Sequence, residues 1–178
     1  MEQDLRAVRP KLWTRDEYDR MIAAGVFKPG ERRELLEGEI LQKIPQGSLH
    51  ATALRLMEDA LRKAFTTRFE VRMQLPLALD AYSEPEPDIA VVPGSVRDYR
   101  DAHPATALLI AEVSDSTLDF DRRRKSSLYA RTGIPEFRVV NLLARQSRNQ
   151  KQSKAATEKG HGEHGKILFR VLRVCFRG

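Results

Sequence analysis

Two short apolar runs constrain the fold of this chain more than any other feature: Ile-Ala-Val-Val at 89–92 and Ala-Leu-Leu-Ile-Ala at 107–111. A strand with one face in water alternates apolar and polar residues. An unbroken, branched apolar run is instead typical of a strand that is covered on both faces. With 178 residues, the chain is long enough to bury such a sheet within one domain.

Each of these runs has one acid at its end. Asp88 directly precedes the first run, and Glu112 follows the second, with Val113 after it. Pro85 and Pro87 hold the approach to Asp88 extended. Aspartate is rare in strands, and a buried carboxylate without a partner is costly. Asp88 therefore either ends a turn and stays in water, or it pairs with a cation.

Neighbouring strands that each carry an acid near one end can bring the two carboxylates together. Like charges at close range repel unless a divalent ion satisfies both, and Mg²⁺ takes oxygen ligands of this kind. Such an ion can polarise a phosphoryl oxygen and supply a hydroxide nucleophile. Lys125 lies in the following segment, "DFDRRRKSSLYA", where it could assist an attacking water or simply belong to a solvated helical face.

The other segments predict a mixed α/β sheet that ends with a strand-helix-strand crossover. A capping box at Thr14 and Glu17 indicates the start of the first helix. The expected elements are a helix from Thr14 to near Gly25, a hairpin with strands near 33–36 and 39–44, a helix at about 48–65, a half-buried strand from Phe69 to Leu75, strands at 89–92 and 106–113, a helix at about 118–131 and a strand at 135–140.

Composition adds limits on class and compartment. The chain is 41% hydrophobic and 31% charged, as in ordinary globular proteins. No apolar run is long enough to span a membrane and the start has no signal-peptide core, so we expect a cytoplasmic protein without a membrane partner. Cys175 is the only cysteine, which excludes an internal disulfide and a cysteine-based zinc site.

The basic charge is concentrated in the last part of the chain. Residues 145–178 hold nine Lys or Arg against two acids, whereas residues 1–144 hold 22 basic and 23 acidic residues. We expect a domain over 1–144 and a basic, irregular tail over 145–178. Residues 167–176 regain apolar character and could form a strand, but no partner for it is evident in the sequence.

Four ordered segments together resemble a known family. The segments "RRELLEGEI", "EPDIAVV", "LLIAEVSDST" and "DRRRKSSLYARTGIPEFRVV" are similar to the Uma-two restriction endonuclease family, which is abundant in cyanobacteria and belongs to the PD-(D/E)XK nuclease superfamily. The resemblance covers about residues 13–140. It implies a restriction-endonuclease-like core flanked by helices, and Mg²⁺- or Mn²⁺-dependent hydrolysis of DNA phosphodiester bonds.

The resemblance also implies roles for five residues. Asp88 and Glu112 fall on the two acids that hold the metal, and Val113 would offer its carbonyl. Ser114 stands where the superfamily motif has lysine, and a lysine displaced onto the next helix matches Lys125. Glu34 matches the acid of the N-terminal segment and would complete the metal shell, directly or through water.

The sequence departs from the family after residue 140, where a patterned strand is replaced by polar and basic residues. A divergent tail and a shifted reading frame both account for this difference. A catalytically inactive module that keeps the fold for DNA binding or regulation is the alternative function, because the body of the chain is nearly neutral. A homodimer is left open, since cutting both strands generally calls for two active sites.

The histidines carry no predicted role. A surface position is expected for His50, just before the second helix, although it could face the cleft. His161 and His164 lie in "HGEHG" of the tail, where a helical metal-binding pair is not expected.

Overall fold

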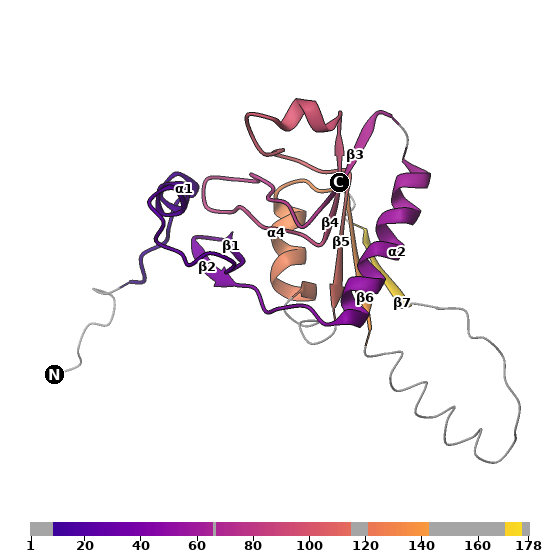
Figure 1. The fold of residues 1–178 in the computed structure, drawn as a ribbon, viewed down its shortest axis with the longest axis horizontal. Coiled ribbons are helices and arrows are strands. Elements are labelled where there is room, and N and C mark those ends of the chain that lie inside the picture. The colour runs from indigo at the N-terminus through magenta and orange to yellow at the C-terminus, as the bar shows by residue number, and fades with distance from the viewer. Residues whose placement is uncertain (1–8, 66, 115–120, 143–169, 176–178) are drawn as a thin grey trace, which may run out of the picture.

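The protein is built around one mixed sheet with helices on both faces, as the computed structural model in Figure 1 shows. The structure describes residues 9–65, 67–114, 121–142 and 170–175. The sheet has the strand order β3 (Phe69–Met73), β4 (Ile89–Pro93), β5 (Leu109–Ser114), β6 (Glu136–Asn141) and β7 (Arg170–Cys175). A separate hairpin consists of β1 (Arg33–Leu36) and β2 (Glu39–Gln42). The predicted α/β class is therefore confirmed.

The helical segments are α1 (Arg15–Ala23), α2 (Ser48–Ala64), the 3₁₀ turn η2 (Val96–Tyr99), the π-helical turn η3 (Asp121–Lys125) and α4 (Ser126–Arg131). In Figure 1, α2 covers one face of the sheet and α4 the other, with the hairpin and α1 beyond α4. Among the strands that the structure describes, only β5 and β6 pair in parallel, and η3 and α4 lie in the crossover between them, as predicted. The first part of the predicted helix, residues 118–120, lies outside the described residues.

The C-terminal apolar segment forms strand β7, and the structure identifies the partner that was not evident in the sequence. Strand β7 pairs antiparallel with β6, from Glu136 opposite Cys175 to Asn141 opposite Arg170. Sequence patterns could not identify the partner, because strand order depends on which sheet edge is open and not on local composition. Of the irregular tail predicted at 145–178, residues 145–169 and 176–178 lie outside the described residues.

Alternate residues of β4 face two different cores, which explains its unbroken apolar sequence. Ile89 and Val91 belong to the core beneath α2, whereas Ala90 and Val92 belong to the core beneath α4. All four side chains are at most 1% exposed. A strand buried on both faces cannot carry a polar side chain without a partner, so the acids at its end need one.

The predicted half-buried strand at 69–75 ends earlier than expected. Strand β3 ends at Met73 because Gln74 adopts a positive φ of 50°, and Leu75 is 45% exposed. The expected alternation also fails at Arg72, which is only 8% exposed and stacks over the Tyr99 ring at 5.3 Å.

The first helix and the hairpin form where the sequence predicted them, although β2 ends at Gln42 and not at 44. The Thr14 hydroxyl accepts a hydrogen bond from the Glu17 N–H, and the Glu17 carboxylate accepts one from the Thr14 N–H, which completes the capping box. The hairpin turns at Glu37 and Gly38, which have φ values of 52° and 82°. A side chain at Gly38 would meet the Leu12 Cβ at 2.7 Å, so this turn requires glycine.

Within the described part of the chain, no helix is long and apolar enough to cross a membrane.

Candidate functional site

The two acids predicted from the strand ends lie side by side. Asp88 directly precedes β4 and is 4% exposed, and Glu112 lies in β5 and is 3% exposed. The Asp88 N–H donates to Glu112 Oε2 at 3.3 Å, and the Val113 N–H donates to Asp88 Oδ2 at 2.8 Å. The β4–β5 register, with Ile89 opposite Ala111, brings these acids together at one end of both strands. The alternative of Asp88 as a solvated turn residue is therefore wrong.

Several hydrogen-bond donors surround the Asp88 carboxylate. Burial acts to raise the pKa of Asp88. The opposing effects of His50, the Val113 N–H and Lys43, in decreasing order, are together larger, and they lower this pKa to about 2. The side-chain amides of Gln46 and Gln74 each donate to Asp88 Oδ1 at 3.3 Å. Asp88 is therefore ionised at neutral pH, as an acid that binds a cation has to be.

Lys125 forms ion pairs with both Glu112 and Glu34. Its Nζ lies 2.9 Å from Glu112 Oε1 and 3.2 Å from Glu34 Oε1. Lys125 and Glu34 are each only 4% exposed, so their readings as solvated surface residues are wrong. The Tyr129 hydroxyl also donates to Glu112 Oε1 at 3.2 Å. The structure thus brings together all four side chains that the sequence indicated, from β1, the start of β4, β5 and η3.

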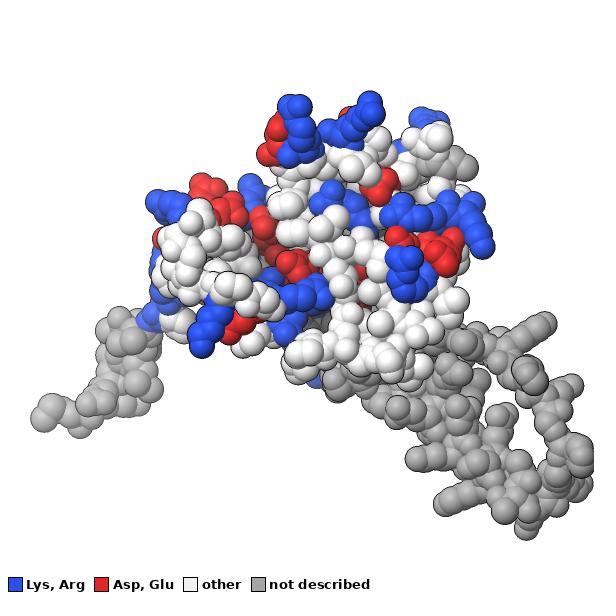
Figure 2. All heavy atoms as spheres, viewed as in Figure 1, with Lys and Arg blue, Asp and Glu red and all other residues white. Residues whose placement is uncertain are grey.

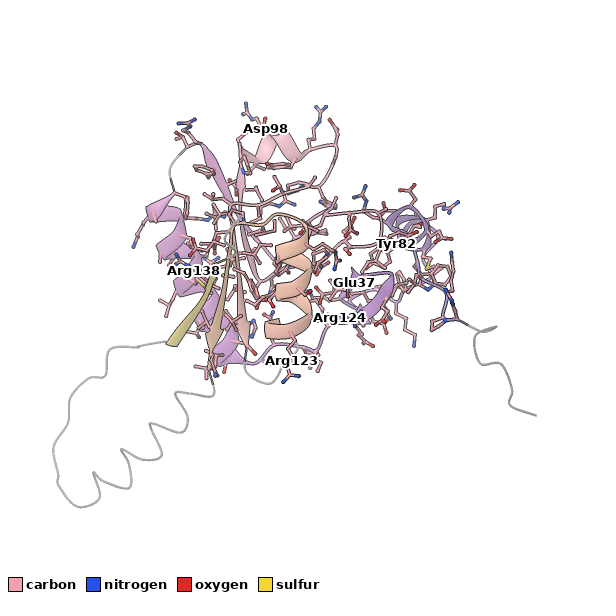
Figure 3. All side chains as sticks on the ribbon, turned by 180° about the vertical axis from the view of Figure 1, so that it is seen from behind. Glu37, Tyr82, Asp98, Arg123, Arg124 and Arg138 are labelled. Atoms are coloured by element: carbon pink, nitrogen blue, oxygen red, sulfur yellow. The ribbon has the colours of Figure 1, made fainter. Side chains whose placement is uncertain are left out.

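Ion pairs hold the hairpin that carries Glu34 against η3 and α4. Arg124 Nε lies 3.4 Å from Glu37 Oε2, and its Nη1 lies 2.9 Å from Glu39 Oε2. Arg131 Nη1 lies 2.8 Å from Glu37 Oε1. Figure 3 shows Glu37 and Arg124 next to each other between the hairpin and α4. The Glu86 N–H donates to Glu34 Oε2 at 3.1 Å and fixes the other side of this carboxylate.

His50 lies beside Asp88, at the candidate site. It is 8% exposed, and its Nε2 lies 3.3 Å from Asp88 Oδ2, so the expected surface position is wrong. A usable signal existed, since His50, Leu54 and Leu61 follow the helical spacing of the buried face of α2. The contacts of Gln46, Gln74 and Tyr129 had no comparable signal, because they depend on how separate segments meet.

The donor chemistry of the site fits a divalent metal ion. Asp88 and Glu112 supply buried carboxylate oxygens, the ligands that Mg²⁺ and Mn²⁺ accept. The N–H and C=O of a strand residue point to the same edge, so the Val113 carbonyl faces the side on which its N–H meets Asp88. Among the described residues, no three His, Cys, Asp or Glu side chains form a ready metal-binding group.

The site lies where the N-terminal elements meet the sheet. Figure 2 shows acidic atoms at the junction between the part formed by α1 and the hairpin and the rest of the molecule. Basic and acidic side chains are interspersed on the face that this view presents.

A further buried acid, Glu84, lies outside this group. Burial is the main cause that raises the pKa of Glu84 to about 7, and the negative charge of Asp19 adds to it. Arg15, whose Nε lies 3.9 Å from Glu84 Oε2, acts in the opposite direction. The folded state therefore holds this proton more tightly than the unfolded chain. The stability that results is present below the ordinary pKa of 4.5 and is lost as the pH rises through about 7.

We therefore expect Glu84→Gln to raise the melting temperature at about pH 8 and to change it little at about pH 4.5, because glutamine cannot ionise. Thermal unfolding monitored by circular dichroism across this range measures the difference. Asp101→Asn, at an exposed acid, is the matched control and should show no such trend. An equal effect of Glu84→Gln at both pH values would contradict the expectation.

Comparisons with known proteins agree with this architecture. The model of the Uma2 family, whose description is "Putative restriction endonuclease", matches residues 15–173. A crystal structure from Anabaena variabilis ATCC 29413, described as that of a "putative nuclease belonging to DUF820", superimposes with a TM-score of 0.56 at 15% sequence identity. The match covers 72% of this chain and 73% of that one. No curated protein matches the sequence.

The family match extends beyond the region that the four sequence segments covered, through the polar residues after 140 and into β7. It includes all the elements that bring Glu34, Asp88, Glu112 and Lys125 together. This chain belongs to the Uma2 family.

Proposed function

We propose that this protein is a metal-dependent endonuclease that hydrolyses DNA phosphodiester bonds. The observation that carries the proposal is the convergence of three buried acids and one buried lysine from four separate segments. Buried charges are costly, and strongly interacting groups of this kind are concentrated at functional sites. The family description and the fold of the Anabaena protein support the same reading.

The roles follow from the positions of the groups. Asp88, Glu112 and the Val113 carbonyl would hold Mg²⁺ or Mn²⁺, and Glu34 would complete the shell directly or through water. A bound ion at this position would polarise a phosphoryl oxygen and lower the pKa of a water molecule. Under this proposal, Asp88 and Glu112 would be the two acids of the PD-(D/E)XK pattern, and Lys125 in η3 would take the role of the lysine that the pattern places where Ser114 lies in β5.

The chain's own groups prepare this site before DNA arrives. The Lys125 ammonium donates to Glu112 and lies next to Glu34, so it is placed to orient a water molecule and to stabilise charge on the phosphoryl group. The Tyr129 hydroxyl fixes the same Glu112 oxygen from α4. Pre-positioned donors of this kind avoid reorganisation during the reaction.

Cleavage of supercoiled plasmid DNA by the full chain tests the proposal. We expect nicked or linear plasmid with Mg²⁺ or Mn²⁺, and no conversion in EDTA. Cleavage that continues unchanged in EDTA, or none with either metal, would contradict the proposal.

The inactive nuclease-fold module is the second candidate. It is favoured by one observation, the Lys125 ammonium between Glu34 and Glu112, because its positive charge offsets part of the negative charge of these two acids. Retention of plasmid DNA in a gel-shift assay, without cleavage under any metal condition, would support this second function.

A further inference from the structure

The imidazole of His50 has an unusual position beside the candidate site. His50 lies in the first turn of α2, and its Nε2 is buried without a hydrogen-bond partner among the described residues. This nitrogen is nevertheless only 3.3 Å from Asp88 Oδ2. The distance is that of an ion pair, but the ring does not meet the carboxylate in hydrogen-bond geometry.

Both Asp88 oxygens have hydrogen-bond donors other than His50, although the nearby imidazole favours the ionised carboxylate. The same oxygen, Oδ2, already accepts the Val113 N–H at 2.8 Å, and Oδ1 accepts the amides of Gln46 and Gln74. A buried polar atom without a hydrogen bond is costly, so each one in a folded protein calls for an explanation. The unpartnered His50 Nε2 lies at a site that is rich in acids, which indicates that it binds a ligand.

The spacing of the two atoms matches two neighbouring ligands of one ion. Ligands at right angles around an ion, with bonds of about 2.1 Å, are separated by about 3 Å. Such ligands lie beside one another and do not bond to each other, which is the relation between His50 Nε2 and Asp88 Oδ2. Neutral imidazole and carboxylate together form common mixed ligand sets for divalent transition metals.

We propose that His50, through Nε2, is a direct ligand of the divalent ion held by Asp88. This inference rests on the proposed metal-dependent function and specifies the chemistry of its site. A nitrogen ligand favours transition metals such as Mn²⁺ over Mg²⁺, which prefers oxygen. The site is therefore a mixed nitrogen and oxygen site, in which α2 supplies the ligand that the strand motif lacks.

Pulsed electron paramagnetic resonance of Mn²⁺ bound to the full chain tests this contact without measuring activity. We expect modulation from a directly bound nitrogen in the wild-type protein and its loss in His50→Ala. His103→Ala, at an exposed histidine, and the double variant His161→Ala/His164→Ala should retain it. Bound Mn²⁺ without nitrogen modulation in the wild-type protein, or a signal lost only with the tail histidines, would overturn the inference.

Calorimetric titration of Mn²⁺ and Mg²⁺ separates this inference from the proposed function. His50→Ala should weaken Mn²⁺ binding by about tenfold or more and Mg²⁺ binding by less, since even outer partners of a metal contribute about tenfold. Metal binding that depends on Asp88 but not on His50 would overturn only the inference. No metal binding by the wild-type protein would overturn both.

Discussion

Replacing Asp88 by Asn is expected to lower the rate of metal-dependent DNA cleavage by about a thousandfold or more. The amide has nearly the same size as the carboxylate but lacks the negative charge that holds the ion. The charge stabilisation that a metal supplies is worth several kcal/mol, and each 1.4 kcal/mol or so corresponds to a factor of ten in rate. Initial rates of plasmid nicking in Mn²⁺, at matched concentrations of folded protein, measure the effect.

Asp98→Asn is a suitable control for this variant. Asp98 is an acid in η2 whose carboxylate caps its own turn at Ser95, and Figure 3 shows it far from Arg124, which lies next to Lys125 in the chain. Its replacement should leave the cleavage rate within about twofold of the wild-type rate, since no metal-binding role is assigned to it. Equal losses in the two variants would indicate a general effect on the fold and would contradict the assigned role of Asp88.

Replacing Lys125 by Met is expected to cost about 3–5 kcal/mol of folding free energy, because it leaves two buried acids without their shared cation. Glu34 and Glu112 are 4% and 3% exposed, so water cannot take the place of the ammonium. Methionine keeps most of the side-chain volume, which limits the packing component of the loss. Urea unfolding at neutral pH measures the change.

Arg123→Met is the matched control, because Arg123 belongs to the same turn but is exposed. Its expected change in stability is within about 0.5 kcal/mol. Saturating Mn²⁺ should restore part of the stability of Lys125→Met, since an ion bound only by the folded state stabilises it by mass action. A loss below about 1 kcal/mol in Lys125→Met would contradict the account of Lys125 as the cation that the acids require.

The acids of the candidate site could be predicted because their positions conflict with their surroundings. Asp88 and Glu112 stand at the ends of runs that are otherwise suited only to a buried strand, and the structure buries both. Lys125 was indicated by its place after the Glu112 strand and by the family resemblance, and Glu34 by the resemblance alone. Their burial could not be derived from local pattern, because it depends on how the hairpin packs against η3 and α4.

Most of the features that could not be predicted depend on contacts between residues that are far apart in the sequence. The pairing of β7 with β6 depends on an open sheet edge that no local pattern describes. The early end of β3 results from the positive φ of Gln74, whose amide turns to Asp88. His50 could have been placed, since it continues the buried stripe of α2, but a polar residue at the start of a helix is usually solvated.

Calorimetric titration of Mn²⁺ into the intact protein and into Asp88→Asn, with plasmid nicking measured on the same preparations, tests whether Asp88 holds a metal ion that DNA cleavage requires. We expect binding and nicking in the intact protein and the loss of both in the variant. Metal binding and nicking that persist in Asp88→Asn, or an intact protein that binds no metal, would contradict this expectation.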